Sequence, residues 1–155
     1  MKIRDVLAVK GRHVETTYPS KPLSEVARQL SERNIASLIV VDTHGRPLGI
    51  ITDRHLIRTL AKSRDWGEAE LKTARDVMES PVPVCILDLS IDAALREMTE
   101  RRTRHLLVVT DGQTEGLVSI GDLVKARRSD AELESRILRD LAYAHMAEGA
   151  APPVR

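Results

Sequence analysis

Two polar pairs with the same spacing, Ser119 with Asp122 and Thr52 with His55, are candidates for binding chemistry. An ionised aspartate only accepts hydrogen bonds, and its two oxygens can accept from both hydroxyls of a ribose. A serine at the N-terminus of a helix lies among free backbone N–H groups, which favour a phosphate. The same spacing also fits a capping box, in which the acid bonds back to the start of its own helix. Both interpretations stay open on the sequence.

The two pairs are not equivalent, because His55 stands where the other pair has Asp122. A neutral imidazole has one donor and one acceptor, so it cannot accept from both hydroxyls of a ribose. If these pairs bind a ribose, the two sites are therefore unequal, and the one at Ser119 and Asp122 is expected to be the stronger. A histidine at a helix start or on the surface is the plainer alternative for His55.

Basic residues accompany the second pair. Arg104 and His105 precede an apolar run, whereas Ala36 and Ser37 occupy the matching place in the first half of the chain. A guanidinium can bind a phosphate through two hydrogen bonds, and an imidazole can add a third. Cations at a helix end, where they complement the helix dipole, are the alternative interpretation.

Catalytic and metal chemistry find little support in the sequence. The five histidines show no metal-ligand spacing with one another or with Cys85, and no Walker loop or GxGxxG motif is present. Cys85 lies in an apolar strand pattern, which predicts a buried and unreactive thiol. We therefore expect no enzyme activity, no catalytic cofactor and no metal.

The elements that carry these residues occur twice in the same order. Apolar residues at helical spacing, Leu23 to Leu30 and Ile91 to Met98, are each followed by two short apolar runs separated by a turn, and then by a closing helix. A first strand precedes each helix, at residues 14–17 and 84–86. Pro22 and Ser90 mark the starts of the two helices. One unit cannot bury both faces of its sheet, so two β-α-β-β-α units packed sheet to sheet around a pseudo-twofold axis are predicted, an α/β (α+β) fold.

Three segments lie outside the repeat. Residues 1–13 carry apolar side chains typical of a short docking helix, and residues 61–80 read as a charged linker that ends in a second short helix. Residues 126–148 predict a C-terminal helix with a stripe of Leu133, Ile137 and Leu141, which needs an apolar partner: another part of the chain, or a second copy. Residues 149–155 are expected to be frayed.

The amino-acid composition disfavours several classes of binding partner. The 155 residues hold 24 Lys and Arg against 23 Asp and Glu, so no basic field attracts nucleic acid. Only 2% are aromatic, which disfavours base stacking. No apolar run approaches a membrane span, and no signal-peptide pattern follows Met1. These features predict a cytoplasmic protein without nucleic-acid or membrane partners.

The repeat resembles a tandem pair of CBS domains, the Bateman module named after cystathionine β-synthase. The matching segments are residues 4–7, 36–42 and 49–56 in the first copy, and 75–78, 104–109 and 116–123 in the second. The likeness is nearest to small, free-standing bacterial pairs. The resemblance implies domains at 1–72 and 73–128, followed by a C-terminal helix and flexible tail at 129–155.

The resemblance also implies a function: a regulatory sensor that binds an adenosine-containing ligand, such as AMP, ADP, ATP, NAD or S-adenosylmethionine, in the cleft between the repeats. It further implies a homodimer. The residues carried over to the ligand site are Thr16, Ala36, Thr52, Arg54, His55, Val82, Pro83, Val84, Arg104, His105, Leu106, Ser119 and Asp122. A ligand-independent dimeric scaffold that regulates an unknown protein partner is the alternative, since the first site lacks its acid.

Overall fold

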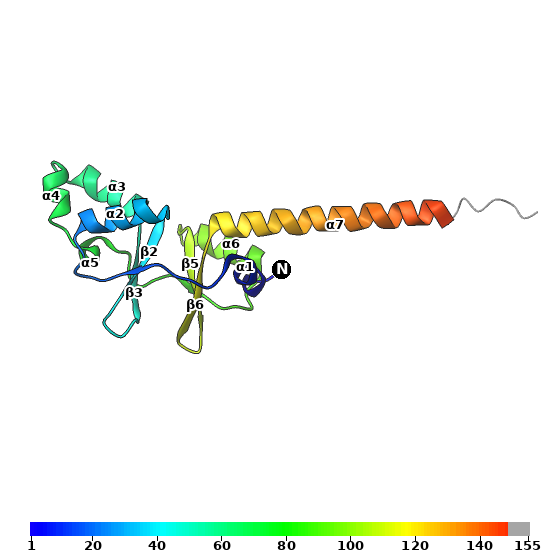
Figure 1. The fold of residues 1–155 in the computed structure, drawn as a ribbon, viewed down its shortest axis with the longest axis horizontal. Coiled ribbons are helices and arrows are strands. Elements are labelled where there is room, and N and C mark those ends of the chain that lie inside the picture. The colour runs from blue at the N-terminus through cyan, green and yellow to red at the C-terminus, as the bar shows by residue number, and fades with distance from the viewer. Residues whose placement is uncertain (149–155) are drawn as a thin grey trace, which may run out of the picture.

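Each half of the chain builds a three-stranded sheet covered by helices (Figure 1). The structure is a computed structural model that describes residues 1–148; the predicted frayed end lies outside the described residues. The first repeat consists of β1 (Thr16–Thr17), α2 (Leu23–Arg33), β2 (Ser37–Val41), β3 (Pro47–Thr52) and α3 (Asp53–Lys62). The second consists of β4 (Val84–Cys85), α6 (Ile91–Glu100), β5 (His105–Thr110), β6 (Gln113–Ser119) and α7 (Ile120–Glu148).

The two sheets have the same topology. In each sheet the central strand pairs parallel with the short first strand and antiparallel with the third. The predicted β-α-β-β-α order is confirmed, although both first strands are only two residues long. Ser90 stands at the N-cap position as predicted, and its hydroxyl accepts from the Ala93 N–H at 3.2 Å. Pro22, expected in the first turn of its helix, stands one position earlier, at the N-cap of α2.

The N-terminal helix α1 (Ile3–Lys10) packs on the second repeat although it precedes the first. Ile3 and Leu7 are buried in the second repeat's core, and the Ile3 N–H donates to the Leu89 carbonyl at 2.9 Å. A Cβ atom at Gly116 would lie 2.8 Å from a Leu7 methyl carbon. The glycine on β6 therefore allows α1 to approach the sheet closely.

Two short helices connect the repeats. The segment predicted as a linker contains α4 (Trp66–Glu70), capped by Asp65, before the expected helix α5 (Ala74–Val77). The linker prediction was wrong about α4, which exists because Ala69 packs into the first repeat's core. On β3, a Cβ atom at Gly49 would lie 2.8 Å from the Glu79 carbonyl oxygen, so the α5 segment approaches this sheet as α1 approaches the other.

A third apolar cluster joins the two sheets. Its buried members come from both repeats: Ile39, Val41, Ile50, Val82 and Leu107. Leu107 is fully buried there. This confirms the prediction that neither unit buries both faces of its sheet alone.

The closing helix of the second repeat and the predicted C-terminal helix form one helix of 29 residues, α7, which projects beyond the body (Figure 1). Leu133, Ile137 and Leu141 are 54%, 50% and 59% exposed, so this stripe does not pack within the chain. Among the described residues, no helix combines the length and the apolar character needed to cross a lipid bilayer.

Thr17 on β1 is a buried polar residue whose effect on stability can be tested. Its side chain is 3% exposed, and its hydroxyl has no hydrogen-bond partner among the described residues. An unsatisfied buried hydroxyl costs about 1–3 kcal/mol, so Thr17→Val should raise the free energy of unfolding by about 1 kcal/mol. Urea unfolding measures this. Thr103→Val is the control and should destabilise, because the Thr103 hydroxyl donates to the His105 carbonyl at 3.2 Å. A lower midpoint for Thr17→Val would contradict the assignment.

Candidate functional site

Ser119 and Asp122 form a capping box at the start of α7. Asp122 Oδ2 accepts from the Ser119 N–H and from its hydroxyl, both at 2.8 Å, and the Asp122 N–H donates to Ser119 Oγ at 3.2 Å. The capping box, one of the two interpretations of the sequence, is therefore present, but it uses only one of the two carboxylate oxygens of Asp122. Among the described residues no hydrogen bond reaches Oδ1, so an acceptor remains for a ligand.

Lys10, at the end of α1, adds a cation to this carboxylate. Its Nζ donates to Asp122 Oδ2 at 2.7 Å and to the Leu117 carbonyl at 2.8 Å. Burial raises the pKa of Asp122, but the hydrogen bonds from Lys10 and Ser119 outweigh it, so the pKa lies below its ordinary value. Asp122 is therefore ionised at neutral pH and can act only as an acceptor.

His105 lies within the electrostatic reach of this pair. Burial lowers the pKa of His105, and the positive charges of Lys10 and Arg104 lower it further against the opposing effect of Asp122. The imidazole is therefore neutral at pH 7 and can donate one hydrogen bond. The exposed Arg104 precedes it on the same chain segment, and the Arg104 carbonyl accepts from the Ile120 N–H at 2.9 Å, next to Ser119.

In the first repeat, His55 takes the structural place of the acid. Its Nδ1 accepts from the Thr52 N–H at 3.0 Å, which fixes the proton of the neutral ring on Nε2. Nε2 lies 3.7 Å from a Glu79 carboxylate oxygen. Burial is the main cause that lowers the pKa of His55, although Glu79 opposes it. The cap is preserved, but the acceptor that a ribose would need is already used.

The two sites have reversed polarity. Lys10, the last residue of α1, meets the carboxylate of Asp122, whereas Glu79, two residues after the end of α5, meets the imidazole of His55. In both cases the C-terminal end of a short docking helix, or the residues just after it, supplies the partner. The repeats therefore share a framework but offer a ligand different charges.

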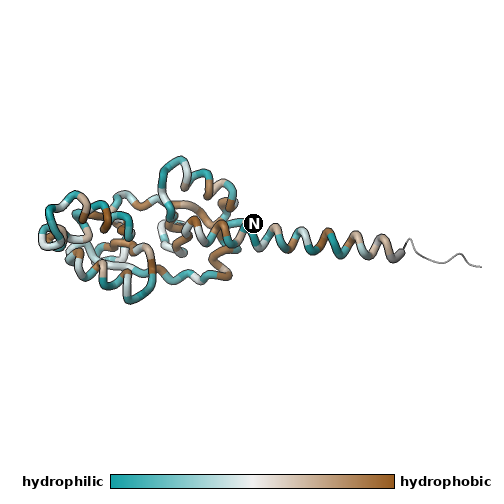
Figure 2. Tube along the Cα trace, turned by 90° about the horizontal axis from the view of Figure 1, so that it is seen from above, coloured by the Kyte–Doolittle hydropathy of each residue, from teal (hydrophilic) through white to brown (hydrophobic). Residues whose placement is uncertain are grey.

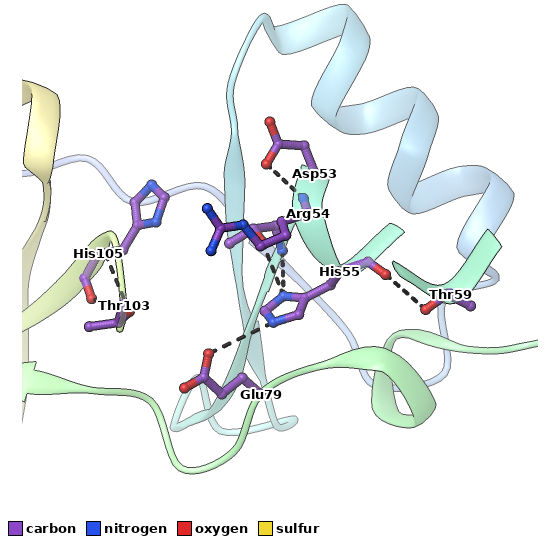
Figure 3. Close-up of polar contacts among 8 residues, drawn as sticks. Asp53, Arg54, His55, Thr59, Glu79, Thr103 and His105 are labelled. Carbon is purple, nitrogen blue, oxygen red and sulfur yellow. Dashed lines mark hydrogen bonds and ion pairs between the residues drawn. The ribbon is translucent and has the colours of Figure 1, made fainter. Parts of the chain in front are cut away.

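A narrow cavity of about 50 Å³ lies between the repeats. Its lining combines both halves: Ile50, Thr52, Asp53, Arg54, His55, Arg58, Glu79, Arg102, Thr103, Arg104 and His105. Figure 3 shows Arg54 extending from the start of α3 into the space between His55 and His105. A cavity this small does not hold a nucleoside, so the arginine side chains must move aside for one to enter.

The structure brings only some of the predicted site residues together. Thr52, Arg54, His55, Arg104 and His105 line the cavity, whereas Ser119 and Asp122 lie beside it around Lys10. The remaining predictions are dispersed: Thr16 is exposed on β1, Ala36 is exposed near α3, Val82 and Pro83 are buried, and Val84 is half exposed. Leu106 is fully buried in the second core, so its side chain cannot touch a ligand in the cleft.

Lys10, Glu79 and Arg58 were missed by the sequence reasoning. The repeated short motif before each unit was visible in the sequence, but not that α1 crosses to the second repeat. Cys85 is buried as predicted, and burial raises its pKa to about 11, so the thiol is protonated at neutral pH. Among the side chains that the structure describes, His, Cys, Asp and Glu nowhere gather in threes as a metal site requires.

Comparison with known proteins accounts for this doubled arrangement. The model of the CBS domain matches residues 3–62 and again residues 74–129. The chain belongs to the CBS domain family. It carries two CBS domains in tandem, and the two matches contain the two capping boxes described above.

Solved structures agree with this CBS pair. A CBS-domain protein of Agrobacterium tumefaciens is 33% identical, with a TM-score of 0.77 over 81% of this chain and 92% of that one. The CBS domain pair of protein MJ0100, solved with 5′-methylthioadenosine and S-adenosyl-L-methionine, is 25% identical, with a TM-score of 0.70 over 81% of this chain and 98% of that one.

A curated relative from Methanopyrus kandleri is 31% identical over 127 residues. These residues span 81% of this chain and 63% of that relative, so the CBS pair covers less than two thirds of the longer protein.

The pH dependence of stability tests the neutral histidines of this CBS pair. Burial lowers the pKa of His55 and His105 below the ordinary value of 6.5, so acidification protonates the unfolded chain first. The stability that the two neutral histidines contribute is fully present above about pH 6.5. It is lost as the pH falls from there towards their lowered pKa values in the folded chain. The urea midpoint should be lower at pH 5.5 than at 7.5. The double variant His55→Gln with His105→Gln should show a smaller change of the urea midpoint with pH. An unchanged pH dependence would contradict the assignment of this effect to the two histidines.

Proposed function

We propose that this CBS pair is a regulatory module that binds an adenosine-containing ligand at the second repeat. The observation that carries the proposal is the ionised Asp122, whose Oδ1 has no described hydrogen-bond partner, beside Lys10 and the neutral His105. An acceptor-only group with cations at its side matches a ribose joined to anionic or polar substituents. The ligands with which the MJ0100 pair was solved, 5′-methylthioadenosine and S-adenosyl-L-methionine, both contain this ribose.

In the proposed complex the ribose hydroxyls donate to Asp122, and Lys10 stays on Oδ2 or turns to the ligand. Arg54, Arg104 and His105 face the substituent at the 5′ position, which makes AMP or NAD a ligand class to test alongside S-adenosylmethionine. The adenine lies along the segment of Val82, Pro83 and Val84, with Thr16 as the counterpart in the first repeat.

The first repeat is proposed as the weaker site. The His55 Nδ1 already accepts from the Thr52 N–H, and Glu79 brings a negative charge next to the ring. A phosphate or carboxylate there would meet Glu79 at close range. One ligand per chain is therefore the proposed stoichiometry.

The proposed module is non-catalytic and cytoplasmic, and it acts as a homodimer on a partner protein that it regulates. The protonated Cys85 supports the absence of nucleophilic chemistry, and CBS pairs are in general regulatory rather than catalytic. A ligand-independent scaffold is the second candidate, favoured by the His55 substitution and by the tightly filled cavity.

Thermal unfolding with a panel of ligands distinguishes the two candidates. Adenosine, AMP, ATP, NAD, 5′-methylthioadenosine and S-adenosylmethionine are each added to the full chain. A ligand at about 100 times its Kd adds about 2.7 kcal/mol of stability. A shift with at least one ligand is expected, larger for AMP than for adenosine at low salt if the arginines bind its phosphate. No shift with any of them at millimolar concentration would favour the scaffold.

A further inference from the structure

A groove of about 290 Å³ runs between α1 and the first turns of α7. Figure 2 shows the N-terminus beside the point where α7 leaves the body, and the Met1 amino group lies 4.0 Å from Asp130. The volume is close to the lower end of the range of small-molecule pockets, about 300–1,000 Å³. The residues that line the groove all differ from those of the cavity between the repeats: Met1, Asp5, Val6, Val9, Lys10, Asp122, Lys125, Ala126 and Ser129.

The apolar part of this lining is aliphatic. It consists of Met1, Val6, Val9 and Ala126, and among the described residues that line the groove none is aromatic. Val6 is buried in the second core, whereas Val9, one turn further along α1, is 92% exposed. Walls of this kind favour an aliphatic group, whose apolar surface they remove from water.

Lys10 brings a cation to the groove from α1. An ammonium has three donors. Lys10 Nζ uses two of them, one to Asp122 Oδ2 at 2.7 Å and one to the Leu117 carbonyl at 2.8 Å. One donor therefore remains for a further acceptor while both of these bonds stay in place.

Lys125 brings a second cation from α7. It follows Asp122 by one turn, so their Cβ atoms are about 5–6 Å apart, and Asp122 is the residue that Lys10 contacts. The next cations on the helix, Arg127 and Arg128, are paired with carboxylates, whereas Lys125 forms no ion pair among the residues that the structure describes. The two lysines thus face one groove from its two walls.

The acids of the groove already have partners. Asp5 Oδ2 accepts from the Lys2 N–H at 2.7 Å, at the start of its own helix, and the charge of Asp122 is compensated by Lys10. Together with the Met1 amino group, the lining holds three cations against these two carboxylates. The excess of positive charge favours an anionic group over a neutral or cationic one.

We propose that this groove is a binding site for a small aliphatic carboxylate. The carboxylate group lies between Lys10 and Lys125, where hydrogen bonds between charged groups are about twice as strong as neutral ones. The aliphatic chain lies along Val6, Val9 and Ala126. Lys10 uses its third donor and keeps its bond to Asp122, so this site does not depend on the adenosine-containing ligand of the proposed function.

Calorimetry of the full chain with octanoate, and with 1-octanol as the uncharged probe, tests the charged end of the site. Octanoate should bind about tenfold more tightly than 1-octanol, because only a carboxylate pairs with the two lysines. Lys125→Glu should remove this difference and leave the affinity for 1-octanol unchanged. Lys62→Glu, the same change on an exposed residue of α3 outside the groove, should bind both probes as the wild type does.

Val9→Glu tests where the aliphatic chain lies. Val9 is so exposed that the fold should tolerate the change, but a charged side chain on this wall should weaken the binding of both probes by about tenfold or more. Val124→Glu is the control, because Val124 is 52% exposed on α7 and does not line the groove. No binding of octanoate at millimolar concentration, or equal octanoate affinity of the wild type, Lys125→Glu and Val9→Glu, would overturn the proposal.

Discussion

Replacing Asp122 by alanine should weaken binding of 5′-methylthioadenosine or S-adenosylmethionine by about 100-fold in calorimetry. A hydrogen bond to a charged group contributes about 1.5–3 kcal/mol, and each 1.4 kcal/mol is tenfold in affinity. The loss of the acceptor for two ribose hydroxyls therefore lowers the affinity by about two powers of ten at the lower end of this range. The removed carboxylate also leaves Lys10 without its ion pair, which disfavours a cationic ligand further.

The control for this change is Asp76→Ala. Asp76 forms the same capping box at α5, accepting from the Thr73 N–H at 2.8 Å and from its hydroxyl at 2.9 Å, but it does not line the cavity. Both variants lose a helix cap, which costs about 1 kcal/mol of stability. Only Asp122→Ala should lose affinity. If both variants bind as the wild type does, Asp122 is a cap and nothing more.

Leu7→Ala should lower the free energy of unfolding by about 2–5 kcal/mol, the usual cost of truncating a fully buried leucine. Leu7 is 1% exposed and fills the space that Gly116 leaves on β6. Val9→Ala on the same helix is the control, because Val9 is 92% exposed and should change stability by less than about 0.5 kcal/mol. Urea unfolding compares the two.

Equal small effects of the two changes would mean that α1 does not contribute to the second core. The same result would remove the support for Lys10 at the site, since α1 is what carries Lys10 to Asp122.

The repeat made most of the fold predictable. The helical spacing that starts at Leu23 and at Ile91 reflects a helix that buries one face. The short runs of branched residues reflect strands that are buried on both faces. The crossing of α1 to the second repeat was not predictable, because Ile3, Val6 and Leu7 would fit either sheet. The continuity of α7 was missed because Arg127 and Arg128 interrupt the apolar pattern without breaking the helix.

The sequence predicted which residues could form the site, but not which contacts these residues make. Ser119 and Asp122 could be read as a cap or as a ligand site, and the structure shows that the cap leaves Oδ1 unused. The exclusion of Leu106 follows from alternation along β5: its neighbours His105 and Leu107 lie on the cleft side, so Leu106 points into the other core. Lys10 and Glu79 are distant in sequence from the residues that they contact, and spacing alone does not reveal such pairs.

A crystal structure of the full chain with 5′-methylthioadenosine or S-adenosylmethionine would show directly whether Asp122 holds the ribose. We expect one ligand per chain, with both ribose hydroxyls within hydrogen-bond distance of the Asp122 carboxylate and the 5′ substituent towards Arg104 and His105. The site beside His55 and Glu79 should stay without ligand. A ribose bound at His55, or a ligand placed away from Asp122, would show that Asp122 is not the ribose acceptor.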